Sequence, residues 1–210
     1  MEKNRHGGLF IAFEGLDGSG STTQSSRLAE HLEKSGFAVV QTKEPTNNLI
    51  GGLIRGQLTR EWSSGQECLQ LLFAADRAHH LEKEIIPALK KRHVVITDRY
   101  LFSSIAFGSL GAQTKWLKQI NDKFILPDIS IYLKVSPESC TKRISNSRFE
   151  MQLFEELERM RKVSKIYGKM NSEFGIREVN GEMNIDDVTK EVIKIVESRL
   201  DKMKKKLARR

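Results

Sequence analysis

A glycine-rich segment near the N-terminus constrains the fold of this chain more than any other feature. The segment GLDGSGST, residues 15–22, follows the apolar run LFIAFE and precedes a stretch with helical periodicity. Glycines let a backbone turn so that successive N–H groups point inward, and the N-terminus of the following helix adds partial positive charge. A strand, such a loop and a helix, in that order, are typical of a phosphate-binding loop.

The segment matches the pattern G-x-x-x-x-G-K-[ST] at every position but one. Ser21 stands where the pattern has lysine, and Thr22 stands where a hydroxyl would ligate Mg²⁺. The alternative is a turn of small residues between a strand and a helix. We predict phosphate binding, and assign it to Gly15, Asp17, Gly18, Ser19, Gly20, Ser21, Thr22 and Thr23.

Along the rest of the chain, short apolar runs alternate with amphipathic stretches. The runs are β-branched or aromatic and bounded by polar residues, which predicts buried strands, and the stretches between them predict helices. Alternating strands and helices favour a parallel sheet with both faces covered. We expect an α/β fold with a five-stranded parallel sheet and helices on both faces, in one domain over 1–210. The expected strands are 9–13, 38–40, 94–97, 129–135 and 176–179, and the expected helices are 22–34, 50–58, 66–91, 115–124, one that opens at Pro137, 150–170 and 185–200.

Charge and composition narrow the classes of partner. The net charge is +8, but the last ten residues, DKMKKKLARR, contribute +5 of it. A basic tail at 201–210 is usually solvated, so we expect no specific nucleic-acid partner. No apolar run reaches the roughly 18 residues of a membrane span, and without a signal-peptide pattern the sequence predicts a cytoplasmic protein. Cys68 and Cys140 stand outside any metal or redox motif, which favours two reduced, packed thiols.

Asp98-Arg99-Tyr100 follows the third expected strand. Ligands collect at the carboxyl ends of parallel strands. A carboxylate there can hold a Mg²⁺ water, and an arginine fork can clamp a phosphoryl oxygen with two hydrogen bonds. The alternative is a structural Asp–Arg pair that caps the next helix.

Phe73 and Arg77 lie four residues apart and therefore on one helix face. A ring beside a guanidinium could stack on a base and donate to its edge; a core Phe beside a surface Arg is the alternative. Arg143 and Arg148 bracket a short polar segment, and we expect a lid at about 143–152 that closes over phosphates. An ordinary helix connection is the competing interpretation.

Together these segments resemble the thymidylate (dTMP) kinases, among the phosphate-loop nucleoside monophosphate kinases. The resemblance covers most of the chain, in the order FEGLDGSGSTTQ, EPT…IRGQL, LLFAADR, VVITDRYLFSSIAF and LPDISIYLKVSPE. LLFxAxR followed by DRYxxSSxA is its most specific part, since other monophosphate kinases share the loop without these two. The resemblance implies a homodimer that transfers the ATP γ-phosphoryl group to dTMP with Mg²⁺, giving dTDP.

The resemblance also implies residue roles at three places: the acceptor nucleotide, the metal and the transferring phosphates. For the acceptor, Phe73 stacks on thymine, Arg77 and Ser104 contact the base, Phe107 lies near the sugar, Arg55 and Arg99 hold the 5′-phosphate, Asp17 approaches the 3′-hydroxyl or the metal shell, and Glu44 and Pro45 complete the set. The metal set is Thr22, Asp98 and Glu14, Arg143 joins the loop in binding ATP, and the catalytic set is Asp98 and Arg99, to which we add Arg148 of the expected lid as our own hypothesis.

Two positions depart from the family pattern. Ser21 replaces the loop lysine, and Gly108 replaces the Gln that often follows the sugar-side aromatic. Loss of one charge-assisted donor costs about 1.5–3 kcal/mol, or up to about 10²-fold in rate. We therefore expect another cation to compensate, with Arg148 as first choice and Arg99, Arg143 and Lys142 as the other candidates.

Two other functions stay open at this stage. The acceptor could be dUMP or another nucleoside monophosphate. Alternatively, the chain could be a catalytically weak nucleotide-binding module, for which Ser21 is the main argument. The retained substrate residues favour an active kinase.

Overall fold

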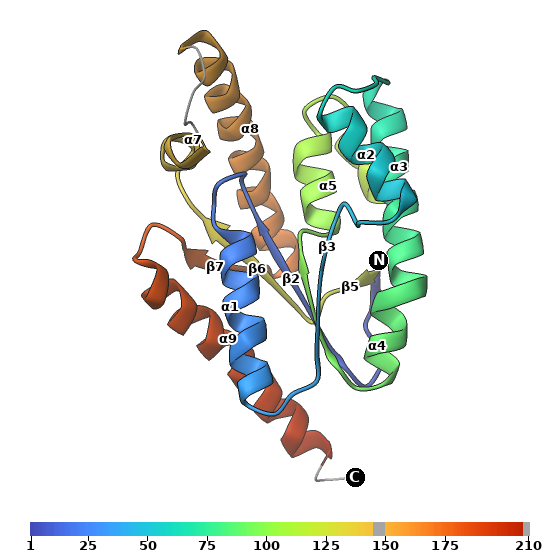
Figure 1. The fold of residues 1–210 in the computed structure, drawn as a ribbon, viewed down its shortest axis with the longest axis vertical. Coiled ribbons are helices and arrows are strands. Elements are labelled where there is room, and N and C mark those ends of the chain that lie inside the picture. Colours follow the sequence, from blue (N-terminus) through green and yellow to red (C-terminus); the bar gives the residue numbers. More distant parts are fainter. Residues whose placement is uncertain (145–149, 208–210) are drawn as a thin grey trace.

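The computed structural model describes the backbone of residues 1–144 and 150–207 and the side chains of residues 1–144 and 155–200. Five parallel strands form the central sheet, in the order β3-β4-β2-β6-β7 (Figure 1). This confirms the expected five-stranded parallel sheet. The strands are β2 (Leu9–Gly15), β3 (Val39–Lys43), β4 (Val94–Asp98), β6 (Ile129–Lys134) and β7 (Arg177–Asn180).

A separate two-stranded parallel sheet joins β1 (Glu2–Lys3) to β5 (Ile125–Leu126). The sequence analysis names neither strand, since two residues are too few to show a period. The helices are α1 (Ser21–Lys34), α2 (Leu49–Leu58), α3 (Gln66–His80), α4 (Ile86–Lys90), α5 (Leu101–Gly108), α6 (Thr114–Ile120), α7 (Pro137–Ile144), α8 (Glu150–Phe174) and α9 (Ile185–Leu207).

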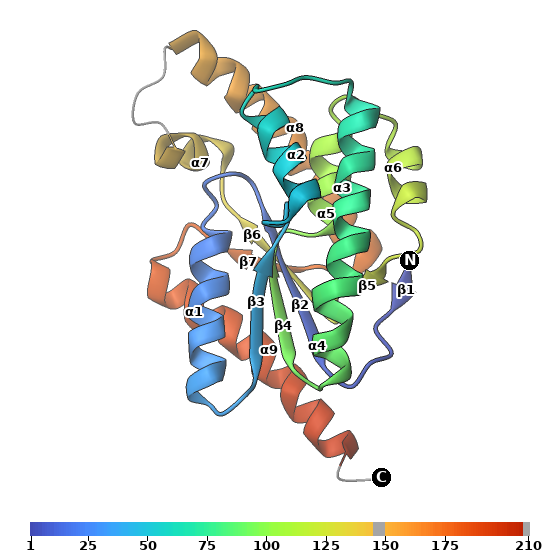
Figure 2. The ribbon, with the colours of Figure 1, turned by 45° about the vertical axis from the view of Figure 1, so that its right-hand side comes forward.

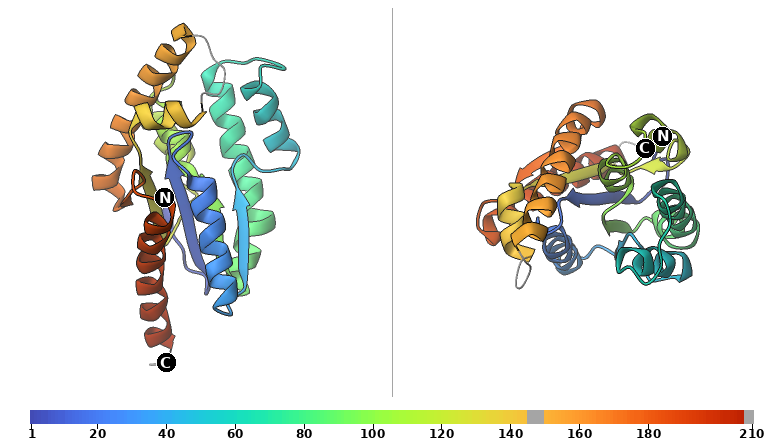
Figure 3. Two further views of the ribbon diagram at one scale, coloured as in Figure 1. Left: turned by 60° about the vertical axis from the view of Figure 1, so that its left-hand side comes forward. Right: turned by 90° about the horizontal axis from the view of Figure 1, so that it is seen from above.

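Helices cover both faces of the sheet. One face packs against α1 and α9 through Leu28, Leu32 and Val192, while α9 continues past the sheet towards the C-terminus (Figure 3, left). The other face packs against α4, α5 and α8, for example through Leu89 and Val163. Figure 2 looks towards the edge strand β3, with α1 on one side and α3 and α4 on the other. Within β2, alternate residues serve the two faces, as the strand pleat requires.

The expected helix over 66–91 is interrupted. A π-helical turn, η1 (Leu81–Ile85), separates α3 from α4. Pro87 lies in the first turn of α4, and a proline lacks the N–H that would bond to the carbonyl four residues earlier, and its ring crowds that carbonyl. A wider turn just before the proline relieves this conflict, and π turns of this kind are frequent at functional sites.

The two thiols lie in different environments. Cys68 on α3 is exposed, whereas Cys140 on α7 is buried, and both are free. Burial raises the pKa of the Cys140 thiol to about 11. None of the described helices is long and apolar enough to cross a membrane.

Candidate active site

The glycine loop joins β2 to α1 at the carboxyl end of the sheet. Gly18 and Gly20 have φ angles of 79° and 92°, values that glycine adopts without strain. Gly20 is the N-cap of α1, and no side chain caps its first-turn N–H groups. These groups are therefore available to an anion, as a helix N-terminus in a phosphate loop requires.

Helix α7 packs directly against the loop. A Cβ atom on Gly18 would lie 2.8 Å from the Cys140 carbonyl oxygen. Arg143, at the end of α7, donates to the carbonyl oxygens of Gly18 at 3.4 Å and Gly181 at 3.2 Å. The structure thus places Arg143 beside the loop, with its guanidinium engaged with backbone oxygens.

Thr22 and Asp98 meet where the loop and β4 end. The Thr22 hydroxyl donates to Asp98 Oδ2 at 2.5 Å, while the buried Asp98 Oδ1 has no hydrogen-bond partner among the described residues. The N-cap of α5 is Tyr100, without a side-chain cap, so Asp98 does not cap that helix. A hydroxyl beside a carboxylate with a vacant oxygen fits Mg²⁺, which takes few protein ligands and keeps water and phosphate oxygens.

Glu14 lies on the other face of the sheet. Its carboxylate is buried and accepts hydrogen bonds from Ser103 at 2.5 Å and Tyr167 at 3.2 Å. Burial raises its pKa to about 7. The structure therefore does not bring Glu14 to Thr22 and Asp98, and within the described residues no cluster of three or more His, Cys, Asp or Glu side chains forms a metal site.

Arg99 turns back towards the loop. Its φ of 70° is unusual for a residue with a Cβ, and its backbone N–H donates to the Phe13 carbonyl oxygen at 2.8 Å. Its guanidinium donates to the Gly15 carbonyl oxygen at 2.8 Å and to Asp17 at 2.6 Å. It also lies 5.2 Å from the centre of the Phe107 ring. The structure thus groups Arg99, Asp17 and Phe107 beside the glycine loop.

Arg77 is buried, contrary to the interpretation as a surface arginine. Its Nη2 donates to Glu44 at 2.6 Å and to Ser104 at 2.8 Å, and its Nη1 donates to Asn121 at 2.5 Å. The buried Nε has no partner among the described residues. Phe73, one helical turn away, is half-buried and outside both apolar core clusters. The Arg77 guanidinium is therefore held in place by three neighbouring side chains, whereas the Phe73 ring is partly exposed to solvent.

A second set of polar groups supports Arg77. His80, also buried, contacts Glu44 through Nδ1 at 3.2 Å and the Thr42 hydroxyl through Nε2 at 2.8 Å. Glu44 thus lies between Arg77 and His80. Sequence reasoning missed His80, since nothing in one sequence shows that residues 36 positions apart meet.

The segment after β3 is anchored to α3 and α2. Asp76, fully buried, accepts hydrogen bonds from the Thr46 backbone N–H at 2.8 Å and hydroxyl at 2.6 Å. Arg55 on α2 donates to the Thr46 carbonyl oxygen. Pro45, which follows a cis peptide bond, joins this segment to Glu44. The structure thus gathers Glu44, Pro45 and Arg55 at the same end of the sheet as Asp98.

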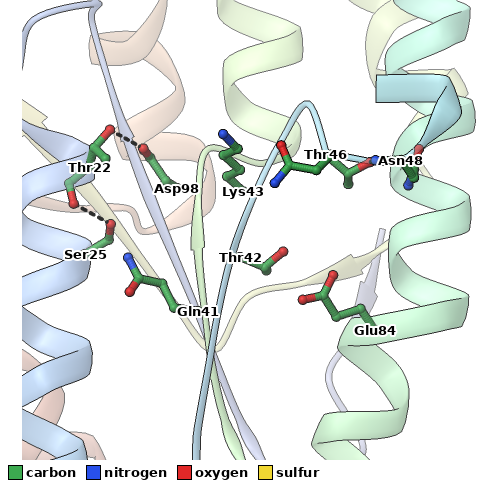
Figure 4. A pocket seen from close by; sticks show the side chains of 10 residues that line it. Thr22, Ser25, Gln41, Thr42, Lys43, Thr46, Asn48, Glu84 and Asp98 are labelled. Atoms are coloured by element: carbon green, nitrogen blue, oxygen red, sulfur yellow. Dashed lines mark hydrogen bonds between the residues drawn. The ribbon is translucent and has the colours of Figure 1, made fainter. Parts of the chain in front are cut away.

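A cavity of about 390 Å³ opens between α1, β3 and η1 (Figure 4). Thr22 and Asp98 form part of its wall, and Lys43, Thr46 and Glu84 form another part. Lys43 is its only basic residue among the described residues, and the sequence analysis did not name it. The signal was weak, because a lysine before Glu-Pro-Thr reads as an ordinary end of a strand.

A smaller cavity of about 170 Å³ lies on the other side of the loop. Ser19, Gly20 and Thr23 of the loop segment line it, together with Arg143 and Met183. Two cavities therefore flank the phosphate loop. The lid predicted at about 143–152 falls largely outside the described residues, and so does Arg148.

Comparisons with known proteins identify the family of this chain. The thymidylate kinase family model matches residues 13–192. The chain belongs to the thymidylate kinase family. A "Probable thymidylate kinase" of Pyrococcus abyssi (strain GE5 / Orsay) is 40% identical over 201 residues, which cover 92% of this chain and 98% of that protein.

Other thymidylate kinases are similar over almost as much of the chain. A "Probable thymidylate kinase" of Pyrococcus horikoshii is 38% identical over 92% of this chain and 98% of its own length. A "Thymidylate kinase" of Desulfotalea psychrophila is 37% identical over 89% of this chain and 93% of its own. The likeness thus spans both the glycine loop and the Arg77 site, as expected for a thymidylate kinase.

Proposed function

We propose that this chain transfers the γ-phosphoryl group of ATP to dTMP, giving ADP and dTDP. Membership of the thymidylate kinase family supports this reaction. The observation that supports dTMP as the acceptor is the buried Arg77 guanidinium, which Glu44, Ser104 and Asn121 hold in place. Its unpartnered Nε–H suits a carbonyl oxygen on a pyrimidine edge, and Phe73 suits the face of the base.

The donor nucleotide, ATP, would bind at the phosphate loop. Inward N–H groups of residues 15–23 would hold the β- and γ-phosphates, and the 170 Å³ cavity beside Arg143 and Met183 would take the rest of ATP. The acceptor phosphate would then lie between Arg99 and Arg55. This arrangement sets both phosphates at the carboxyl end of the sheet, the position typical of α/β folds.

Phosphoryl transfer needs positioning and charge neutralisation more than proton transfer. The bond from the γ-phosphorus to the β,γ-bridging oxygen breaks, and its electron pair stays on ADP. A phosphate oxygen of dTMP, already ionised, forms the new bond. Because that oxygen carries no proton to remove, no general base is required. Arg99 would align it for the transfer.

Thr22 and Asp98 would hold Mg²⁺. Bound there, the ion would offset charge on the β- and γ-phosphates. We leave Glu14 out of this set because its carboxylate lies on the other face of the sheet with Ser103 and Tyr167. Instead, Glu14 would fix Ser103, which in turn accepts from Arg99 at 3.1 Å.

We further propose a homodimer through α2 and α3. Among the described residues, four of the six exposed large apolar side chains lie there: Leu49 (82%), Leu53 and Leu58 on α2 and Leu71 on α3. A second copy would bury them. Sedimentation of the wild type against Leu53→Glu tests this: a monomeric wild type would contradict it. We also place the activity in the cytoplasm, where free thiols persist.

One coupled assay tests the reaction. ADP release is measured with ATP and Mg²⁺ against dTMP, dUMP and other monophosphates. Activity highest with dTMP supports the proposal, and activity highest with dUMP reassigns the acceptor. Tight dTMP binding without ADP release would identify a nucleotide-binding module, the alternative that Ser21 favours.

The lid arginine remains a prediction from the sequence. Arg148→Ala is expected to lower kcat if Arg148 replaces the loop lysine. A kcat within twofold of wild type would rule out that role and direct attention to cations elsewhere in the site.

A further inference from the structure

The phosphate loop of this chain lacks its usual cation, because Ser21 occupies the lysine position. A serine hydroxyl is neutral and its side chain is short, so it cannot span the distance that a lysine side chain covers. Ser21 is also almost fully buried in the first turn of α1. The charge on the transferring phosphoryl group must therefore be met from another element.

The described arginines near the loop are already engaged. Arg99 donates to Gly15 and Asp17, and Arg143 donates to Gly18 and Gly181. Each would have to give up contacts within the apo site to reach a γ-phosphate. Arg99 is in addition the natural clamp for the acceptor phosphate.

Lys43 is in a different situation. It is the last residue of β3, and in the parallel register its Cα partner is Asp98. Partner residues in adjacent strands project from the same face of the sheet, so Lys43 and Asp98 lie side by side on the α1 face. Figure 4 shows the Lys43 side chain between the Thr22–Asp98 pair and Thr46.

The Lys43 side chain is exposed in the 390 Å³ cavity. Among the described residues, no carboxylate lies within ion-pair distance of its ammonium, and no hydrogen bond engages that group. The other charged residues on the wall are Asp98 and Glu84. A free cation therefore faces the metal-binding pair across a space large enough for phosphate groups.

We propose that Lys43 supplies the cation missing at position 21, by donating to non-bridging oxygens of the γ-phosphoryl group during transfer. The inference rests on the proposed function and names a further catalytic residue for it. No proton moves: the bond to the ADP oxygen breaks, the bond to the dTMP oxygen forms, and the ammonium stabilises the charge on the group between them. A lysine approaching from β3 would replace one approaching from the loop.

A double-mutant cycle tests the replacement directly. Lys43→Met keeps the apolar stem and removes the charge, and Ser21→Lys restores the loop lysine. In the wild-type background, Lys43→Met is expected to lower kcat by about 10- to 100-fold, the loss of one charge-assisted contact. In the Ser21→Lys background the same change should cost less than about threefold, because the loop lysine then carries the charge.

The matched control is Lys91→Met. Lys91 is an exposed lysine just after α4, at the amino end of the sheet, so this variant has the same net charge as Lys43→Met and should keep wild-type kcat. An equal loss of kcat from Lys43→Met in both backgrounds would overturn the inference. A rise in KM for dTMP alone would also overturn it, by assigning Lys43 to the acceptor.

A binding measurement covers the case in which Ser21→Lys does not fold. Calorimetry compares Mg-ADP with the Mg²⁺ complex of the β,γ-imido analogue of ATP. Lys43→Met should weaken the analogue by about tenfold and leave ADP unchanged; equal affinities for the analogue would contradict the inference. If the wild type releases no ADP with any monophosphate, the proposed function itself fails, and the role of Lys43 fails with it.

Discussion

Arg77 and Glu44 form an ion pair sealed from solvent, with 2.6 Å between Nη2 and Oε2 and neither side chain more than 2% exposed. Taking two charges out of water is costly, and the remaining donors and acceptors must be satisfied for such a pair to persist. Here Ser104, Asn121 and His80 provide most of those contacts. The pair therefore belongs to a fixed polar network within the core.

Breaking this pair should destabilise the fold. Glu44→Ala leaves the Arg77 charge buried without its partner, so we expect the free energy of unfolding to fall by about 3–5 kcal/mol. Urea unfolding followed by circular dichroism measures it. Glu173→Ala is the control, since Glu173 pairs with Lys118 at the surface and should cost under about 1 kcal/mol. Equal losses in the two variants would contradict a special role for the buried pair.

His80 should act on acceptor binding through Glu44. His80→Leu removes both ring hydrogen bonds, so Glu44 and Arg77 lose their fixed position and KM for dTMP should rise about tenfold. kcat should stay within about threefold, because the His80 ring contacts Glu44 and Thr42 and does not itself line the 390 Å³ cavity. His80→Gln, which keeps polar atoms, should recover part of the loss. A fall in kcat at unchanged KM would speak against this positioning role.

Phe73 is expected to contribute through stacking. Phe73→Leu keeps an apolar side chain but loses the aromatic face, which is worth about 0.5–1.5 kcal/mol. KM for dTMP should therefore rise about two- to tenfold while KM for ATP is unchanged. Steady-state kinetics with each substrate varied gives both values, with Phe37→Leu, the same change just before β3 at the amino end of the sheet, as the matched control. An unchanged KM for dTMP would place the base elsewhere.

Asp98→Asn should alter the magnesium dependence. The amide keeps the shape of the side chain and can still accept from Thr22, but it removes the charge that would attract Mg²⁺. We expect the Mg²⁺ concentration at half-maximal rate to rise several-fold and kcat to fall. Asp122→Asn, at an exposed aspartate after α6, should match the wild type. An unaltered magnesium titration of Asp98→Asn would exclude Asp98 from the metal site.

Glu14 should make stability depend on pH. Its pKa is raised by burial from 4.5 to about 7, so between these values the native state binds more protons than the unfolded state. The stability of the wild type should then fall as pH rises from about 4.5 to about 7, relative to Glu14→Gln, by a total on the order of 3 kcal/mol. Urea unfolding of both proteins at pH 5 and pH 7.5 measures the difference. A wild type that gains stability over the variant with rising pH would show the carboxylate to be favoured in its charged form.

The sequence predicts most of the sheet because its strands are short apolar runs between polar residues. The expected strand at 94–97 is one residue shorter than β4 (Val94–Asp98), and that at 9–13 is two residues shorter than β2 (Leu9–Gly15). Helix α5 (Leu101–Gly108) was missed, because nearly all of its residues are buried and a helix buried all round shows no apolar stripe.

The candidate site likewise contains residues that a local sequence motif predicts and residues that only the packing of distant segments brings together. Asp98 and Arg99 were predictable because their neighbours in the sequence form a motif. Lys43 and Asn121 were not, because their places depend on strand register and on helix packing. Arg77 is an intermediate case. Its place in the site was predicted, but its burial was not, because that burial depends on Glu44, 33 residues away.

The π-helical turn η1 determines how the side-chain faces of α3 are rotated relative to those of α4 about their common helix axis. Buried Arg77 and His80 lie on α3 before the turn, Leu81 and Ile85 lie in it, and Leu89 lies on α4 after it. The i→i+5 hydrogen bonds of a π turn enclose one residue more than the i→i+4 bonds of an α-helix. One residue corresponds to about 100° of rotation. The extra residue thus lets the upstream half present Phe73 and Arg77 to a nucleotide while the downstream half keeps Leu89 on the sheet. Such a turn is equivalent to the insertion of a single residue into an α-helix. After deletion of one residue from 81–85, a regular helix could keep either Phe73 and Arg77 or Leu89 in its present orientation, but not both.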